Sequence, residues 1–173
     1  MLLEIIDPYF LLWRLPLKEK EREMDPLDKG LINLLTRDGR MPVGKIAESL
    51  DITPPTVRAR LDALFRSGVL RVAGLVNAFK NKELTVAIVG ICLERHQELD
   101  KKLEQISELD QIHWAAVVTG NYDIIVEVVT TGGMPGLYDF LAGALPQVGG
   151  IRSTDSFMVM KAKGKWILYP QQP

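Results

Sequence analysis

Small and basic side chains around residues 53–60 have the types and spacing that contact with DNA requires. On a helix of about 100° per residue, Val57, Leu61 and Leu64 fall within roughly 60° of one another and define a buried face. We expect the outward residues to meet DNA, with Thr56, Arg58 and Ala59 nearest the base edges. Arg60 and Lys45 are expected to contact phosphates. The complete set of candidate DNA contacts is Lys45, Thr53, Pro55, Thr56, Arg58, Ala59 and Arg60.

Two helices joined by a very short turn must position these side chains. Val43–Leu50 is a short amphipathic segment, and Asp51–Ile52 leaves room only for a tight turn. Thr53 can cap the next helix with its hydroxyl, and Pro54 suits the first helical position, where no N–H is needed. This pattern predicts a DNA-binding helix-turn-helix. A helical hairpin inside another kind of α domain is the alternative, and spacing alone leaves both open.

A supporting helix precedes this pair and a short strand follows it. Asp25 is the expected cap of the first helix, which ends at Asp38–Gly39. The apolar stripe of that helix consists of Leu27, Leu31, Leu34 and Leu35. Ser67–Gly68 ends the third helix, and Val69–Val72 is a candidate strand. We therefore predict that residues 24–76 form an N-terminal winged helix-turn-helix head with a hinge strand.

The charge of the chain is nearly balanced overall but uneven along its length. The 173 residues have a net charge of −1, and 47% of them are hydrophobic, which is enough for packed cores. Residues 24–76 hold eight basic and six acidic side chains, a net +2, whereas the residues from 77 onward hold nine and eleven, a net −2. So small a positive charge predicts that two or more heads act together on DNA.

The single cysteine and two histidines argue against metal or cofactor chemistry. Cys92 cannot form an internal disulfide, suits a reducing compartment such as the cytoplasm, and lies in an apolar run where a buried thiol is expected. His96 and His113 with one cysteine give no metal-ligand spacing. Paired carboxylates, a Ser-His-Asp set and a phosphate loop are not evident, so we expect no enzyme and no cofactor. His113 is expected to be a structural or interface residue.

Residues 1–23 are an N-terminal extension of unclear role. Its apolar stretches are interrupted by charged residues and proline, so neither a membrane-spanning helix nor a signal peptide is expected. Three interpretations are open: a helix that docks at a subunit interface, a membrane-surface anchor, or a start codon placed too early, with Met24 as the true start. The first and third are favoured.

The pattern of apolar residues changes after a polar linker at residues 77–83. The expected elements are, in order, a strand over 84–93, a helix over 97–109, strands over 112–119 and 122–130, a helix over 135–145 and a strand over 151–162. Gly120–Asn121 is a tight hairpin signal between the second and third strands. The order βαββαβ predicts a ferredoxin-like domain over residues 84–173, and the whole chain is expected to be α+β.

Both faces of the predicted sheet are apolar. Along its first strand, one alternating set consists of Val86, Ile88, Gly90 and Cys92, and the other of Ala87, Val89, Ile91 and Leu93. The two helices can cover only one face. The second face needs a partner, and face-to-face dimerisation is the simplest solution.

The span from Asp25 to about Pro170 resembles the Lrp/AsnC, or feast/famine, family of transcription regulators. The matching segments are Asp25–Asp28 with the Leu-rich helix after it, Ile46–Leu50, Thr53–Arg58, Gly68–Leu70, Leu93–Glu94 and Val118–Asp123. Many winged-helix repressors share the helix-turn-helix segments, whereas Thr119–Asp123 is more specific. The first 23 residues depart from the usual family layout.

The resemblance implies a DNA-binding head and a C-terminal domain for effector binding and assembly. In such proteins homodimers assemble into tetramers, octamers or larger rings, and a small molecule, often an amino acid, binds between dimers. The family's effector loop maps to Gly120, Asn121, Tyr122 and Asp123, with Thr154 and Ser156 as neighbours. Such a loop can offer backbone N–H groups to a carboxylate, and Asp123 can take an α-ammonium. The alternative is a plain hairpin turn that Asp123 caps.

Two other functions share this layout. Sirohaem decarboxylases are similar, but that branch has histidine- and arginine-rich sheet residues, and His113–Thr119 holds one histidine and no arginine. An architectural DNA-binding protein without an effector also fits, because large assemblies can wrap DNA. We expect a sequence-specific regulator of transcription that binds double-stranded DNA and responds to a small effector such as an amino acid.

Overall fold

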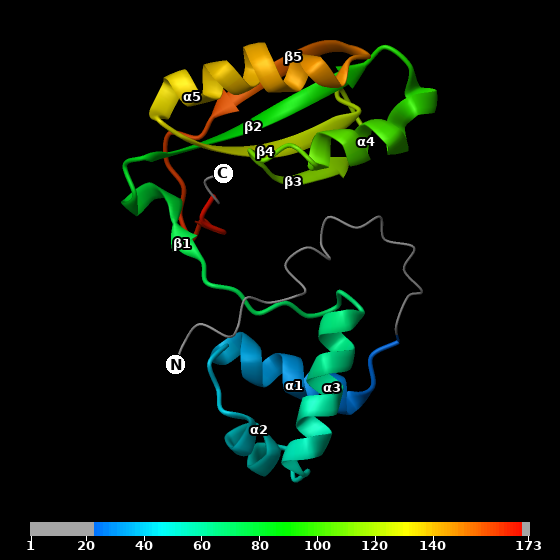
Figure 1. Ribbon diagram of the computed structural model, residues 1–173, viewed down its shortest axis with the longest axis vertical. Coiled ribbons are helices and arrows are strands. Elements are labelled where there is room, and N and C mark those ends of the chain that lie inside the picture. The colour runs from blue at the N-terminus through cyan, green and yellow to red at the C-terminus, as the bar shows by residue number, and fades with distance from the viewer. Residues whose placement is uncertain (1–22, 171–173) are drawn as a thin grey trace. The chain divides into compact units, whose positions relative to one another are not determined.

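The computed structural model describes residues 23–170, which divide into two compact units between Ala73 and Gly74 (Figure 1). The interpretations of the N-terminal extension concern residues 1–22, which lie outside this described range. The division falls just before the predicted linker at residues 77–83. That segment packs with the second unit, because Ala78 is buried there in a small apolar cluster.

Three helices around one core form the first unit, the head. They are α1 (Pro26–Arg37), α2 (Val43–Ser49) and α3 (Pro54–Arg66). The predicted apolar stripes meet where the helices cross, and the side chains that are fully buried there are Leu31, Ile46, Val57 and Leu64. The turn between α2 and α3 is tight because Asp51 adopts a left-handed backbone with φ 52°, which aspartate tolerates better than most residues.

The segment that follows the head differs from the prediction. Val69–Val72 is not a strand: residues 70–75 have no regular structure, and a strand forms only at β1 (Val76–Asn77). A strand needs a partner, and β1 has one in β6 (Trp166–Ile167), which the sequence pattern did not indicate. For the same reason the last predicted strand, 151–162, ends early, because the chain leaves the sheet to reach β6.

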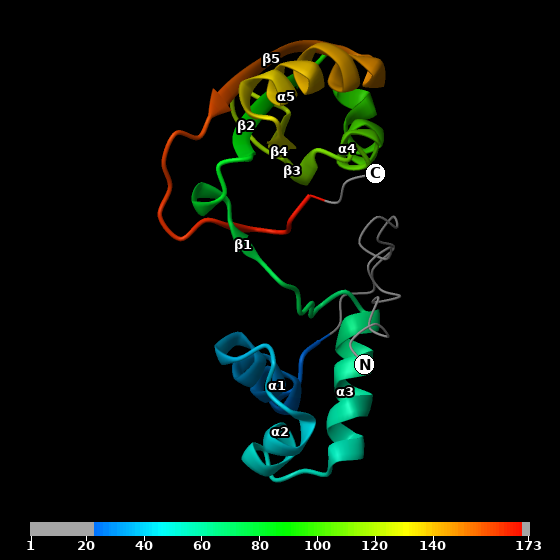
Figure 2. The same cartoon turned by 60° about the vertical axis from the view of Figure 1, so that its left-hand side comes forward.

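The second unit is an antiparallel sheet with helices on one face (Figures 1 and 2). Its strands are β2 (Leu84–Leu93), β3 (Ile112–Val117), β4 (Ile124–Thr131) and β5 (Ile151–Met158), in the order β3-β4-β2-β5. The first connection is a 3-10 turn, η3 (His96–Glu98), and α4 (Leu99–Ser107). The second is α5 (Gly133–Asp139), a π turn, η4 (Phe140–Ala144), and a 3-10 turn, η5 (Leu145–Val148). This is the predicted ferredoxin-like βαββαβ arrangement, and the α+β class is confirmed.

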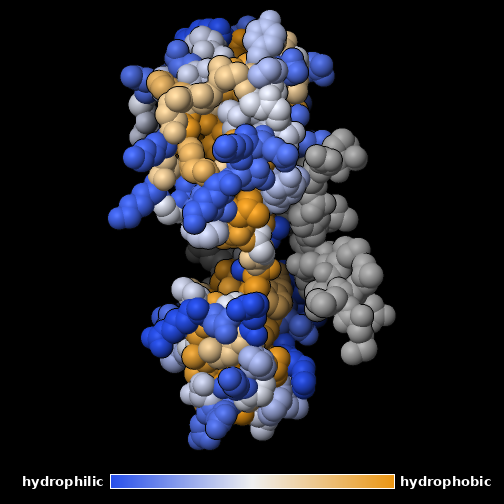
Figure 3. All heavy atoms as spheres, turned by 90° about the vertical axis from the view of Figure 1, so that its left-hand side faces the viewer, coloured by the Kyte–Doolittle hydropathy of each residue, from blue (hydrophilic) through white to orange (hydrophobic). Residues whose placement is uncertain are grey.

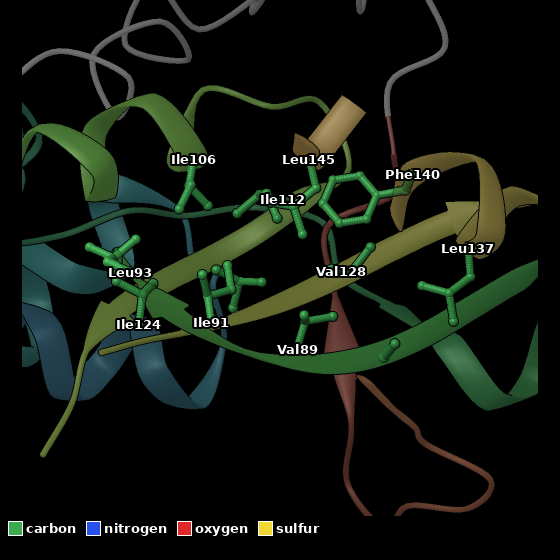
Figure 4. Packing of buried hydrophobic residues seen from close by; sticks show 12 residues of the cluster. Val89, Ile91, Leu93, Ile106, Ile112, Ile124, Val128, Leu137, Phe140 and Leu145 are labelled. Atoms are coloured by element: carbon green, nitrogen blue, oxygen red, sulfur yellow. The ribbon is translucent and has the colours of Figure 1, made fainter. Parts of the chain in front are cut away.

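The main core of this unit lies between the sheet and the helices (Figure 4). Alternate residues of β2 point into it, namely Ala87, Val89, Ile91 and Leu93, and they meet β4 residues Ile124, Val126 and Val128. Ile106 of α4 and Phe140 of η4 close the core from the helix side. Each of these side chains is at most 2% exposed, and burying one contributes about 1.5–3 kcal/mol to folding.

The other face of the sheet is only partly covered. The β1–β6 ribbon and a 3-10 turn, η2 (Ala78–Lys80), cover one end of it, where Val86, Val129 and Ile167 are buried. Farther along the same face Trp114 and Phe157 remain 41% and 54% exposed. We call the part of this face beyond the ribbon the open face. Gly90 and Asp155, which pair in register, also lie on it.

Candidate functional site

The N-terminus of α3 presents most of the predicted DNA contacts. Thr53 caps the helix, because its Oγ1 accepts the Thr56 N–H at 3.4 Å and lies 2.8 Å from Thr56 Oγ1. Thr56 is half-buried, whereas Pro55, Arg58 and Ala59 are exposed on the helix, as is Lys45 on α2. The polar ends of Lys45, Thr56 and Arg58 can approach a duplex from solvent, and small Ala59 does not obstruct it.

Arg60 has a different role from the predicted phosphate contact. Its guanidinium forms ion pairs with Asp25 and, at 3.3 Å, with Asp28, both at the start of α1. The N–H of Asp28 and the guanidinium of Arg60 hold the pKa of Asp25 below its usual range, and Asp25 raises the pKa of Arg60. Arg60 therefore ties α3 to α1. Its spacing from buried Val57 and Leu64, three residues after the first and four before the second, was the available sequence signal.

The loop between β3 and β4 brings the predicted effector residues to one end of the sheet. Gly120, with φ 121°, and Asn121 are exposed, and the Val118 N–H donates to the Asp123 carbonyl at 3.1 Å to close the turn. Asp123 is anchored on both carboxylate oxygens: Oδ2 accepts the Leu93 N–H at 2.7 Å, and Oδ1 lies 2.9 Å from Nδ1 of His96. The side chain of His96 is 79% exposed, so an incoming ammonium could replace it without disturbing the buried contact.

Tyr122 turns away from this turn and covers the backbone of Gly90 on the open face. A β-carbon at position 90 would lie 2.6–2.7 Å from Cγ, Cδ1 and Cε1 of the tyrosine ring. Asp155 is the residue that pairs with Gly90 on β5. Burial raises the pKa of Tyr122, and the hydrogen-bonded carboxylate of Asp155 adds to the effect.

Thr154 and Ser156 lie on the opposite face from Tyr122. They pair with Ile91 and Val89, which both face the helices. Asp155, between them, is the β5 neighbour of Tyr122, because alternate residues of a strand point to opposite faces. The contact of Thr154 and Ser156 with an effector stays a prediction. Asp155 and Gly90 were missed. A glycine inside an apolar strand was the available signal, because it marks a place where another group approaches the backbone.

A polar cluster of buried Glu127 with half-buried His113 and Lys165 lies next to the C-terminal segment. Glu127 Oε1 lies 2.8 Å from His113 Nδ1, and Oε2 is paired with Lys165. Because His113 Nε2 accepts the Leu168 N–H at 3.0 Å, the imidazole proton of neutral His113 belongs on Nδ1, the nitrogen next to Glu127. Burial alone would raise the pKa of Glu127, but His113 and Lys165 outweigh it and hold the pKa below its usual range. His113 thus has the structural role expected of it.

Metal-binding clusters and membrane-spanning helices are both absent from residues 23–170. No group of three or more histidine, cysteine, aspartate or glutamate side chains in this range is arranged to hold a metal ion. None of the helices described here combines the length and apolar content that a membrane crossing needs.

Comparison with known proteins assigns both units. Residues 24–64 match the AsnC-type helix-turn-helix domain, and residues 86–165 match the Lrp/AsnC ligand binding domain. An uncharacterised HTH-type transcriptional regulator of Pyrococcus abyssi is 32% identical over 145 residues, which cover 83% of this chain and 90% of that protein.

Two solved structures show the same fold. Escherichia coli AsnC superimposes with a TM-score of 0.65 at 22% identity, covering 82% of this chain and 95% of AsnC. A Neisseria meningitidis transcriptional regulator, solved as a complex with L-Met, gives a TM-score of 0.64 at 18% identity, with 80% and 91% covered.

Proposed function

The chain belongs to the Lrp/AsnC family of transcriptional regulators, and from this premise we propose that it binds specific DNA sequences under the control of a small effector. It has a DNA-binding helix-turn-helix domain and a ligand-binding domain. The observation that carries the proposal is the contrast between two arginines of α3: Arg60 is held by Asp25 and Asp28, whereas Arg58 is exposed. One arginine fixes the helix and the other is available to DNA.

In this proposal the first turns of α3 enter the major groove. Thr56, Arg58 and Ala59 lie nearest the base edges, and Lys45 on α2 neutralises a phosphate. An arginine that forms two hydrogen bonds to a guanine discriminates against the wrong base by about 1–3 kcal/mol. Arg58 is therefore the residue on which sequence selectivity depends most.

The effector site in this proposal is the loop of Gly120, Asn121, Tyr122 and Asp123, and its ligand is an amino acid. The exposed backbone of Gly120 and Asn121 can donate to the ligand carboxylate. The α-ammonium then takes the place of His96 on Oδ1 of Asp123, while Oδ2 stays on the Leu93 N–H. The complex of a similarly folded Neisseria meningitidis regulator with L-Met makes amino acids the first ligands to test.

Assembly links the two sites. We expect the open face, with exposed Trp114 and Phe157, to be buried in a homodimer, which pairs two heads and doubles the small positive charge available to DNA. Dimers then associate into tetramers, octamers or larger assemblies. A ligand that binds one assembly better than another changes the spacing of the heads, with a coupling of about 1–3 kcal/mol. Such a protein acts in the cytoplasm, where its DNA is.

Two experiments test the proposal. Selection from random duplexes by the full-length protein should enrich one motif, and a library that stays random would favour an architectural DNA-binding protein instead. A thermal-shift screen against the amino acids should identify the effector, because a ligand that binds only the folded state raises the melting temperature.

A pair of variants then locates the ligand. Gly120→Ala and Gly120→Asp both place a side chain on a backbone with positive φ, but only the aspartate places a negative charge where the ligand carboxylate is proposed to bind. The thermal shift should persist in Gly120→Ala and vanish in Gly120→Asp. If both variants respond equally, the ligand binds elsewhere and the loop is a plain hairpin turn.

We propose no catalytic activity for the chain. The Pyrococcus abyssi relative is named as a transcriptional regulator. His113, the residue closest to the sirohaem-decarboxylase pattern, has both ring nitrogens next to protein partners, Glu127 and Leu168. A purified protein that carries a tetrapyrrole colour would contradict this.

A further inference from the structure

Two adjoining loops of the second unit carry four exposed lysines. The loops are residues 78–83, between β1 and β2, and residues 159–165, between β5 and β6. Their lysines are Lys80, Lys82, Lys161 and Lys163, which we call the lysine patch. The function described above uses none of these residues.

The strand register brings these two loops together. At one end of both loops Asn77 pairs with Trp166, and at the other end Ala87 pairs with Met158. Between these points the Val159 N–H donates to the Val86 carbonyl at 2.9 Å, and Ala78 packs in the same small core as Val159. Figures 1 and 2 both show the short helix after β1 beside the chain that leaves β5. The two pairs of lysines therefore belong to one surface.

The local charge of this surface is strongly positive in a unit that is otherwise acidic. The two loops hold five lysines and one acidic residue, Glu83. Lys165 is neutralised by buried Glu127, but among residues 23–170 none of the four patch lysines takes part in an ion pair. The space-filling view shows hydrophilic side chains projecting from this side of the second unit (Figure 3). Four unpaired ammonium groups on adjacent loops attract a polyanion.

We propose that the lysine patch is a second DNA-binding surface, which contacts phosphates without reading sequence. The inference rests on the proposed function, because DNA is the polyanion that the head would hold next to this unit. The seven residues Gly74–Lys80 span at most about 25 Å. Lysine is a flexible point charge, suited to phosphates rather than to the paired acceptors of a base edge. The patch compensates for the small net charge of the head.

The test is the salt dependence of DNA binding by the full-length protein. Lys80→Gln/Lys82→Gln and Lys161→Gln/Lys163→Gln are compared with Lys101→Gln/Arg152→Gln, which removes the same charge from exposed positions elsewhere in the second unit. Each lost phosphate contact should lower the slope of log K against log salt by about 0.9, so each patch variant should lower it by 1–2. The fall in affinity should be equal for the preferred duplex and for a scrambled one. The control variant should keep the wild-type slope.

A conservative variant separates the effect of charge from the effect of local structure. Lys161→Arg/Lys163→Arg retains both charges and should retain the slope. Wild-type slopes in both patch variants would overturn the inference, and so would an equal loss in the Lys101→Gln/Arg152→Gln control. The proposed function fails separately, when the wild type shows no preference between the two duplexes or when Arg58→Ala keeps that preference unchanged.

Discussion

The ring of Tyr122 occupies the space that a side chain at position 90 would fill. A β-carbon on Gly90 would approach three ring atoms to within 2.7 Å, much closer than side chains pack. This contact fixes the last part of the loop that leads to Asp123. The glycine is therefore part of the candidate effector site even though it lies in the middle of β2.

Gly90→Ala is expected to displace Tyr122 and to destabilise the second unit by about 1–3 kcal/mol, as overpacking does in a close-packed structure. The free energy of unfolding in urea measures the effect. Gly143→Ala is the matched control, because no atom lies within 4 Å of a β-carbon at position 143. If the two variants are equally stable, Tyr122 moves aside at no cost and does not fix the loop.

Arg60→Ala should destabilise the head without changing the sequence that it selects. The variant removes the ion pairs with Asp25 and Asp28, which join α3 to α1. A lower melting temperature, together with an unchanged ratio of affinities for preferred and scrambled duplexes, is the expected result. A changed ratio at wild-type stability would restore Arg60 to the DNA-contacting residues.

Glu127→Gln should destabilise the protein at neutral pH by on the order of 3 kcal/mol, because it leaves Lys165 and His113 without their buried partner. The pKa of Glu127 is held below its usual 4.5, so its stabilising effect is complete above that pH and is lost as the pH falls through the lower folded-state value. Unfolding free energies of wild type and variant should therefore converge at acidic pH, below the lowered pKa of Glu127. Exposed Glu104→Gln is the control. A difference that is the same at both pH values would contradict this account of the cluster.

Phe157→Glu should convert the assembled protein to monomers. Phe157 is 54% exposed on the open face, and two carboxylates facing each other across a dimer interface cannot both be buried cheaply. Light scattering on the full-length protein measures the mass. Met134→Glu changes an equally exposed apolar residue of α5, on the helix side of the sheet, and should keep the wild-type mass. A monomeric Met134→Glu together with a Phe157→Glu of wild-type mass would place the dimer interface on the helices.

Local signals explain which parts of the structure could be predicted from the sequence. The caps Asp25 and Thr53 and the apolar stripes define the helices of the head, and β2 has the predicted bounds. The failures concern pairing between distant segments. Val69–Val72 has the pattern of a strand, but the strand forms at β1, because its partner β6 lies there, about 90 residues later in the chain.

The candidate site shows the same division between local and distant effects. Arg58 and Arg60 are two arginines of the same helix, and the sequence alone does not distinguish their roles. The fold does, because it places Asp25 and Asp28 of the α1 start next to Arg60. From the sequence we predict Thr154 and Ser156, not Asp155, beside the loop. Which face of the sheet each β5 residue occupies depends on the register of β5 with β2, and one sequence does not define that register.

The most direct test of the central claim is the affinity of Arg58→Ala for the selected duplex and for a scrambled one, at fixed salt concentration. Arg66→Ala, which removes an exposed arginine from the last turn of the same helix, is the matched control. We predict that Arg58→Ala loses about 1–3 kcal/mol of affinity for the selected duplex and little for the scrambled one, so that selectivity falls, while Arg66→Ala keeps it. Unchanged affinity and selectivity in Arg58→Ala would contradict the assignment of α3 as the helix that reads DNA.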